Sequence, residues 1–154
     1  MVKPSHSNTI AGWREWVALP ALEVPWIKAK LDTGARTSSI HAFDVEDLGD
    51  TVRFTVHPWQ ESEDGAVVTE LPVHDRRVVR SSSGHTEDRI VVLMDVRLFD
   101  RTIEVEMTLT NRDAMGFRML IGREALRQGF IVDASASFLG GRAPRSVRMA
   151  NRGR

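Results

Sequence analysis

The sequence predicts a mainly β domain that contains one short helix near its C-terminal end. Apolar and polar residues alternate in several runs, which is the pattern of strands with one buried face. Glycine, proline, asparagine and aspartate fall between these runs, where tight turns are needed. One stretch, residues 123–128, is expected to be helical, and it ends at Gly129 in the position of a glycine cap. With 154 residues, the chain is long enough to bury one core.

The first half of the chain contains four expected strands. Residues 13–19 form an apolar run that stops at a proline, and residues 26–31 alternate between apolar and basic side chains. Residues 37–42 have an extended pattern, and residues 52–56 alternate again before another proline. The following residues, 59–65, are acidic, and we expect a solvated loop there without a chemical role.

The second half of the chain is expected to be built from hairpins. Residues 67–73 and 76–80 are predicted to be short strands, and residues 81–86 form a small polar tip suited to a hairpin turn. Longer strands at 89–98 and 103–110 are expected to pair across the turn between them. Two further short strands flank the helix, at residues 119–122 and 130–132.

We expect three segments along the chain: an N-terminal tail over residues 1–9, a folded domain over residues 10–140 and a basic tail over residues 141–154. The last segment carries arginines and no acidic residue, which favours a mobile tail over a folded element. Such a tail could hold an anionic partner, although nucleic acid is the less favoured interpretation. Over the whole chain, 21 basic residues balance 21 acidic ones, so no overall charge points to nucleic acid or to a membrane surface.

Residue usage also limits the expected cellular setting. The chain has no cysteine, which excludes disulfides and cysteine-based zinc sites and is compatible with a reducing compartment. Residues 1–10 lack the apolar core of a signal peptide, and no run is long enough to span a membrane. We therefore expect a soluble, cytoplasmic protein without a membrane partner.

The strand at residues 26–31 runs directly into Asp32, Thr33 and Gly34, a candidate for half of an aspartic-protease active site. Gly34 lets the backbone approach the Asp32 carboxylate and offer it an N–H, and the Thr33 hydroxyl can donate and accept within the same turn. Alone, the motif is a weak signal, because any given Asp-Thr-Gly occurs by chance in roughly a few per cent of chains of this length. An ordinary turn between two strands explains it about equally well.

A second signal lies at residues 119–126, where a short apolar strand meets Gly122, Arg123 and a helical turn. This order resembles the retroviral-type aspartic proteases, in which an Asp-Thr-Gly-Ala turn and a flap hairpin precede two apolar residues, glycine, arginine and a short helix. The resemblance implies a retropepsin-like acid-protease barrel in which Gly122 and Arg123 support the site. It also implies that the Gly122 strand packs beneath the Asp32 turn, where a larger residue would displace the turn.

The chain resembles even more closely a bacterial family of retropepsin-like proteins named ATP-dependent zinc proteases. The matching stretches spread over most of the domain, at residues 12–17, 27–42, 108–112 and 119–126. The resemblance implies that the hairpin tip closes over substrate as a flap. Substrate-binding residues would then be Ser83, Gly84 and His85 of the tip, with Ala35 and Arg36 of the turn. The separation between the tip and the glycine of the second signal is near the one expected from the retroviral pattern.

The chain contains only one Asp-Thr-Gly, which predicts that the catalytic unit is a dimer. Peptide hydrolysis by this chemistry needs two carboxylates that share a proton and hold a water molecule. A two-fold symmetric homodimer would bring Asp32 of each subunit to the axis and complete the pair. Ala35 offers no hydroxyl to the charged dyad, so we expect a less acidic dyad than one followed by serine or threonine, and hydrolysis nearer neutral pH.

Arg36 stands where the retroviral pattern usually has an acidic residue, so Arg123 cannot find its usual acid there and its partner is not predictable. At the lip of the cleft, Arg36 would favour acidic peptide side chains, with Arg80 or Arg89 of the flap strands as further candidates. The alternative is that Arg36 serves an internal ion pair. Members of the resembled family tend to accompany a ligase that adds glutamates to a ribosomal protein, which implies that the reaction is trimming of glutamate tails.

Other catalytic chemistries lack their motifs. The chain has no His-Glu-x-x-His for zinc, no Gly-x-x-x-x-Gly-Lys phosphate loop for ATP and no Gly-x-Ser-x-Gly elbow. A metal site would have to be assembled by folding, because the histidines expected on strands and loops are scattered: His41, His57, His74 and His85. We therefore expect no metal and no cofactor. The remaining alternative is a non-catalytic retropepsin-like module that binds an acidic peptide or a ribosomal partner, although the retained Asp-Thr-Gly favours an enzyme.

Overall fold

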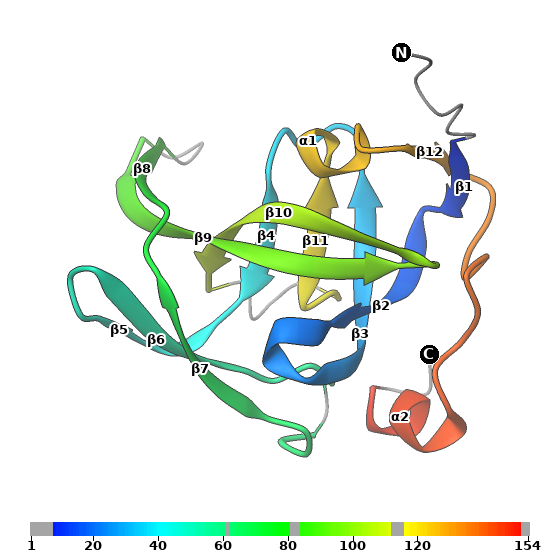
Figure 1. The fold of residues 1–154 in the computed structure, drawn as a ribbon, viewed down its shortest axis with the longest axis horizontal. Helices are drawn as coiled ribbons and strands as arrows, with labels where there is room; N and C mark the ends of the chain where they lie inside the picture. Colours follow the sequence, from blue (N-terminus) through cyan, green and yellow to red (C-terminus); the bar gives the residue numbers. More distant parts are fainter. Residues whose placement is uncertain (1–7, 61, 81–83, 112–115, 152–154) are drawn as a thin grey trace, which may run out of the picture.

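The computed structural model describes residues 8–60, 62–80, 84–111 and 116–151. Ser83 lies outside the described residues, as do Arg112 and most of the expected N-terminal tail. The fold is mainly β, as the sequence predicts, and short helices complete it (Figure 1). Among the described residues, no helix is long and apolar enough to cross a membrane.

Seven strands form the main sheet, in the order β10-β4-β11-β3-β2-β9-β8. A further pairing of β9 with β10 closes six of these strands into a barrel and leaves β8 attached outside it. Closure pairs the backbone groups that would otherwise be exposed at the sheet edges. The strands are β2 (Arg14–Leu19), β3 (Val24–Asp32), β4 (Ser38–His41), β8 (Asp75–Arg80), β9 (Thr86–Leu98), β10 (Arg101–Thr110) and β11 (Met119–Gly122).

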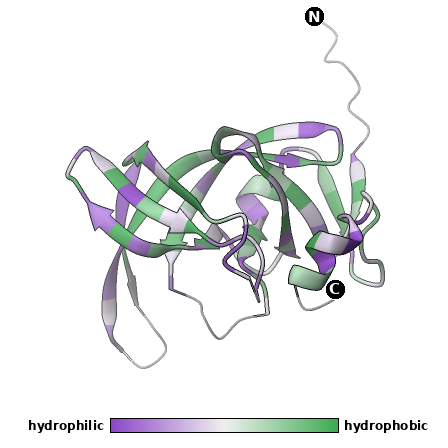
Figure 2. Ribbon diagram, turned by 90° about the horizontal axis from the view of Figure 1, so that it is seen from below, coloured by the Kyte–Doolittle hydropathy of each residue, from purple (hydrophilic) through white to green (hydrophobic). Residues whose placement is uncertain are grey.

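The core of the barrel is filled by the apolar side of each strand, and hydrophobic and hydrophilic residues alternate along the strands in Figure 2. On β3, the apolar residues of the alternating run, Ile27, Ala29 and Leu31, are all buried. The other face of β3 is covered as well, since Lys28 is 4% exposed and its Nζ lies 4.9 Å from the ring centroid of Phe117. The turn at the C-terminal end of β3 therefore stands on a strand that is packed on both faces.

Two smaller sheets lie beside the barrel. One has three antiparallel strands and the other has two parallel strands. The sequence did not indicate the first strand of the larger one, because acidic residues have low strand propensity and its register shifts between Phe43 and Glu46, where Asp44 has a φ of 50°. The strands are β5 (Phe43–Asp47), β6 (Thr51–Val56), β7 (Val67–Pro72), β1 (Thr9–Gly12) and β12 (Phe130–Asp133).

The helices are short. The predicted helix over residues 123–128 is present as α1 (Arg123–Leu126), and a 3₁₀ turn, η1 (Pro20–Leu22), connects β2 to β3. The chain also forms a second α-helix, α2 (Arg145–Ala150), which lies apart from α1 near the C-terminus (Figure 1).

The C-terminal segment differs from the predicted mobile tail over residues 141–154. Its helix α2 packs on the body through a small apolar cluster that contains Trp16, Ala143 and Val147. Ala143 and Val147 lie four residues apart in this arginine-rich segment. Together they give the segment one apolar face that packs on the body. The prediction of a mobile tail is therefore wrong for residues 141–151.

A buried carboxylate holds the segment that leads to α2. Glu15 of β2 is fully buried, with 0% exposed. Its two oxygens accept hydrogen bonds from the backbone N–H groups of Gly12 at 2.7 Å, Leu139 at 2.9 Å and Gly140 at 3.0 Å. Three N–H donors thus take the place of water around this side chain and tie the C-terminal segment to the start of the barrel.

We expect Glu15→Ala to lower the free energy of unfolding by about 3 kcal/mol or more, because three buried N–H groups lose their acceptor. Urea unfolding followed by tryptophan fluorescence measures the change. Glu70→Ala is the matched control, since this exposed residue pairs with Arg53 on the neighbouring strand and should contribute less than about 1 kcal/mol. Equal effects of the two substitutions would contradict the structural role of Glu15.

Candidate active site

The Asp32 turn holds its own carboxylate through backbone donors. Asp32 is the last residue of β3, and its Oδ1 accepts the N–H groups of Gly34 at 3.0 Å and Ala35 at 3.3 Å. A Cβ added at Gly34 would lie 3.2 Å from this oxygen, so a larger residue would crowd the carboxylate. Asp32 is half-buried, whereas Thr33 and Gly34 are exposed. The turn thus presents an oriented carboxylate at the molecular surface.

The glycine at the end of β11 lies directly beside this turn. Gly122 is in parallel register with Asp32, and a Cβ on it would lie 2.5 Å from the Thr37 carbonyl oxygen and 2.9 Å from the Ala35 carbonyl oxygen. Its N–H donates to Ser38 Oγ at 2.9 Å. The close approach leaves no space for a side chain, which explains the glycine.

The start of α1 completes this arrangement. The backbone N–H of Arg123 donates to the Ala35 carbonyl at 2.7 Å, and that of Glu124 donates to the Arg36 carbonyl at 3.0 Å. Arg123 Nη1 also donates to the Thr33 carbonyl at 3.3 Å. The partner of Arg123 that the sequence could not name is therefore a backbone carbonyl of the Asp-Thr-Gly turn.

Gly122→Ala should lower the free energy of unfolding by about 2 kcal/mol, since the added methyl group forces the Ala35–Thr37 backbone away from β11. We also expect a large loss of any activity that depends on the turn. Gly116→Ala is the matched control, because a Cβ there would meet nothing within 4 Å. Urea unfolding and activity assays on both variants measure the difference, and an unchanged Gly122→Ala protein would refute the close-packing explanation.

Arg36 forms the internal ion pair that was the alternative interpretation of this residue. Its Nε lies 3.7 Å from Glu124 Oε1, and the two side chains are 77% and 49% exposed. An exposed pair at this distance contributes little to stability. Arg36 therefore has a partner within the chain but can exchange it for another carboxylate at low cost.

The hairpin formed by β8 and β9, here called the flap hairpin, is present where the sequence predicts it. Arg80 is in register with Thr86 at its end, and Gly84 has a φ of 86°, which suits a glycine in a tip. Gly84 and His85 are exposed. Within the described part of the chain, no hydrogen bond or ion pair joins these two residues to the Asp32 turn, in contrast to Gly122 and Arg123.

A cavity of about 600 Å³ lies next to the turn. It is bordered by the residues that directly follow the turn, by α1, by β10 and by one residue of the flap hairpin. Its charged lining consists of two arginines and three glutamates, so the surface here is mixed and not uniformly basic. The lining residues are Arg36, Thr37, Ser38, Arg77, Glu104, Val105, Glu106, Glu124, Ala125 and Gln128.

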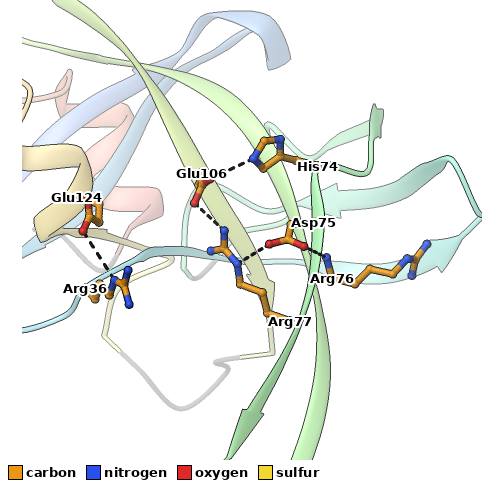
Figure 3. A network of polar contacts seen from close by, with 7 residues as sticks. All are labelled: Arg36, His74, Asp75, Arg76, Arg77, Glu106 and Glu124. Carbon is orange, nitrogen blue, oxygen red and sulfur yellow. Dashed lines mark hydrogen bonds and ion pairs between the residues drawn. The ribbon is translucent and has the colours of Figure 1, made fainter.

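Of the residues that line this cavity, the sequence singled out Arg36 alone, and Arg77 and Glu106 are the missed pair with the shortest contact. Arg77 donates to Glu106 Oε2 at 2.8 Å and to Asp75 Oδ2 at 2.8 Å, and His74 Nε2 lies 3.1 Å from Glu106 Oε1 (Figure 3). The hydrogen bond from Arg77 holds the pKa of Glu106 below its usual value, and it does the same for Asp75. The sequence indicated only that Arg77 is a basic residue on a flap strand. Its hydrogen bond to Glu106 could not be predicted, because it depends on how β8 is placed relative to β10.

The described residues do not fit a zinc site. Among them, no three histidine, aspartate or glutamate side chains come together in a group that could hold a metal ion. His41 instead lies buried on β4 with its ring centroid 4.2 Å from that of Phe43, and His74 contacts Glu106.

The chain is similar to known proteins over most of its length. A family model described as "Retropepsin-like aspartic endopeptidase RimB" (RimB-like) matches residues 10–143. The chain is 48% identical over 138 residues to a "Probable alpha-L-glutamate ligase" of Shewanella pealeana, and 44% identical over 131 residues to a protein of the same name from Desulfotalea psychrophila. The alignments cover 87% and 82% of this chain but only 30% and 28% of the two relatives. The chain thus spans less than a third of the length of these curated relatives.

A solved structure resembles the fold. The crystal structure of Lpg0085, a protein of unknown function from Legionella pneumophila, has a TM-score of 0.71 and 29% identity, and the match covers 87% of this chain and 99% of that one. The family match includes the Asp32 turn, the flap hairpin, Gly122 and α1. The chain therefore belongs to the RimB-like family of retropepsin-like aspartic endopeptidases.

Proposed function

We propose that the chain is an aspartic endopeptidase whose catalytic unit is a homodimer with one Asp32 from each subunit. The observation that carries the proposal is the orientation of the Asp32 carboxylate by the N–H groups of Gly34 and Ala35 on a turn packed against Gly122. A turn built for surface exposure alone would not need this close packing. A carboxylate held on a rigid base is what general acid–base chemistry requires.

In the proposed reaction, one carboxylate of the dyad takes a proton from water while the other, protonated, donates to the carbonyl oxygen of the peptide bond. The water oxygen bonds to the carbonyl carbon and forms a tetrahedral intermediate. The carboxyl group that gained the water proton then gives it to the amide nitrogen, and the other carboxylate takes a proton from a hydroxyl of the intermediate. Cleavage of the C–N bond releases an amine and a carboxylic acid and restores the dyad. The two N–H donors to Asp32 Oδ1 fix the orientation of the carboxylate in which it would meet the water.

We further propose that the substrate is a peptide rich in glutamate. Two features support this class. The relatives named as glutamate ligases contain a region similar to this chain within the same polypeptide, so glutamate addition and peptide hydrolysis would concern the same product. In addition, Arg36 is close to the turn, exposed and only weakly paired. A carboxylate of the peptide could replace Glu124 at Arg36.

Asp32→Asn should abolish cleavage of a peptide that ends in several glutamates, at neutral pH and with a metal chelator present throughout. The amide cannot act as the base, so we expect a loss of at least about 10³-fold. Mass spectrometry of the products measures cleavage. Asp100→Asn, in the exposed turn between β9 and β10, is the matched control and should retain activity. Activity of the Asp32→Asn protein on addition of zinc would contradict the dyad.

Mixing subunits tests the shared dyad directly. If each active unit needs Asp32 from both chains, an equal mixture of native and Asp32→Asn protein that exchanges freely should keep about a quarter of the native activity, whereas independent subunits would keep about half. Analytical ultracentrifugation measures the dimer over the same concentrations. A chain that stays monomeric and does not cut would favour the non-catalytic binding module instead.

Arg36→Glu should abolish the preference for acidic peptides, because it places a second negative charge beside Glu124 in the cavity lining. The measurement is the ratio of kcat/KM for a glutamate peptide to that for the same peptide with glutamines. Arg97→Glu makes the same change of charge on an exposed position of β9 that does not line the cavity, and should keep the ratio. An unchanged ratio in Arg36→Glu would show that Arg36 does not determine the preference for acidic peptides.

A further inference from the structure

We infer that Arg77 is the anchor for an acidic side chain of the peptide, and that Glu106 is an internal carboxylate that the peptide must displace from it. The inference rests on the proposed function, because it assigns a specificity element to the same site. It adds a residue of the flap hairpin and a residue of the barrel that neither the motif nor the family description indicates.

The position of Arg77 suits this role. Arg77 comes from β8, the outer strand of the flap hairpin, and Glu106 comes from β10 of the barrel. Both line the cavity that is also bordered by residues 36–38, directly after the Asp32 turn. The inference places an acidic side chain of the peptide in this cavity, where it can reach the Arg77 guanidinium.

The guanidinium of Arg77 is oriented before a ligand arrives. Its Nε donates to Asp75 and its Nη2 donates to Glu106, both at 2.8 Å (Figure 3). Among the described residues, Nη1 has no acceptor, so part of the donor fork stays open. The side chain is 33% exposed, which lets solvent and ligands reach it. A fixed and partly open guanidinium can bind a carboxylate through two parallel hydrogen bonds.

Glu106 occupies the position that a peptide carboxylate would take. One of its oxygens accepts from Arg77 and the other lies 3.1 Å from His74 Nε2 (Figure 3). When a peptide carboxylate replaces Glu106 at the Arg77 guanidinium, Glu106 keeps its contact with His74. Asp75 continues to orient the guanidinium. The exchange therefore leaves neither the displaced carboxylate nor the arginine without a partner, which keeps its cost low.

The charge balance of the cavity explains why Glu106 would control selectivity. Two arginines and three glutamates line the cavity. Arg36 pairs with Glu124, which also pairs with Arg127, and Arg77 pairs with Glu106 and with Asp75, so the whole set has one more acidic than basic group. Within the described part of the chain, Glu104 has no cationic partner. The ligand-free cavity is thus slightly negative and opposes a carboxylate unless that carboxylate takes over an arginine.

Peptide binding to the Asp32→Asn chain tests the inference without cleavage. The probes are a fluorescently labelled peptide with four consecutive glutamates and the same peptide with glutamines, and fluorescence anisotropy measures the dissociation constants. Arg77→Gln should weaken the glutamate peptide about tenfold and leave the glutamine peptide unchanged. Arg77→Lys keeps the positive charge but cannot donate two parallel hydrogen bonds to one carboxylate. It should therefore weaken binding of the glutamate peptide less than Arg77→Gln does.

Glu106→Gln should have the opposite effect. The amide keeps the shape and can still accept from Arg77, but it removes the competing charge, so the glutamate peptide should bind about threefold more tightly. Most of this gain should disappear when Arg77→Gln is also present. Arg97→Gln and Glu70→Gln remove the same charges outside the cavity and should leave both peptides unchanged.

Equal weakening of both peptides by Arg77→Gln, weaker glutamate binding after Glu106→Gln, or no binding of either peptide would each overturn the inference. Cleavage by the native chain is measured separately. A native chain that cuts while the binding pattern is absent refutes the anchor alone. The binding pattern in a chain that does not cut supports the anchor and refutes the peptidase.

Discussion

The Asp32 turn depends on a contact between two backbones that leaves no room for a side chain. Where β11 ends at Gly122, a Cβ would overlap the Thr37 carbonyl oxygen. This closeness lets the Gly122 N–H reach Ser38 and lets the N–H of Arg123 reach the Ala35 carbonyl. The turn, β11 and the start of α1 consequently form one unit, and the carboxylate is oriented through backbone groups that cannot change rotamer.

The same unit contributes one side of the cavity, so the proposed catalytic residue and the proposed substrate-binding residues share a support. Residues 36–38 follow the turn and line the cavity, while Glu124 and Ala125 of α1 line it next to them. The charged partners Arg77 and Glu106 come from the flap hairpin and from β10. Substitutions of those outer residues therefore change the cavity without disturbing the turn, whereas changes at residues 35–38 would affect both.

The sequence predicts the features that depend on local patterns. Alternation locates most of the strands, and the short motifs locate the Asp32 turn and Gly122, because turn chemistry and close approach need particular residue types. Features that depend on distant contacts were not predictable. Helix α2 needs an apolar face on the body to dock against, and the hydrogen bond from Arg77 to Glu106 joins residues 29 positions apart. Glutamates on the outer face of the 103–110 strand were visible in the sequence, but the strand that would meet them was not.

The barrel is not equally tight around its circumference. β9 and β10 are bridged along eight residue pairs, whereas in the described structure β2 and β9 are bridged at the single pair of Ala18 and Arg97. In the described structure, β2 and β9 are the neighbouring barrel strands with the fewest bridged pairs, and β9 is also a strand of the flap hairpin. Separation there breaks few hydrogen bonds. This join lies at Arg97, near the end of β9 that is away from the hairpin tip, so its opening would leave in place both the pairing of β9 with β10 and the pairing of β3 with β11 beside the Asp32 turn.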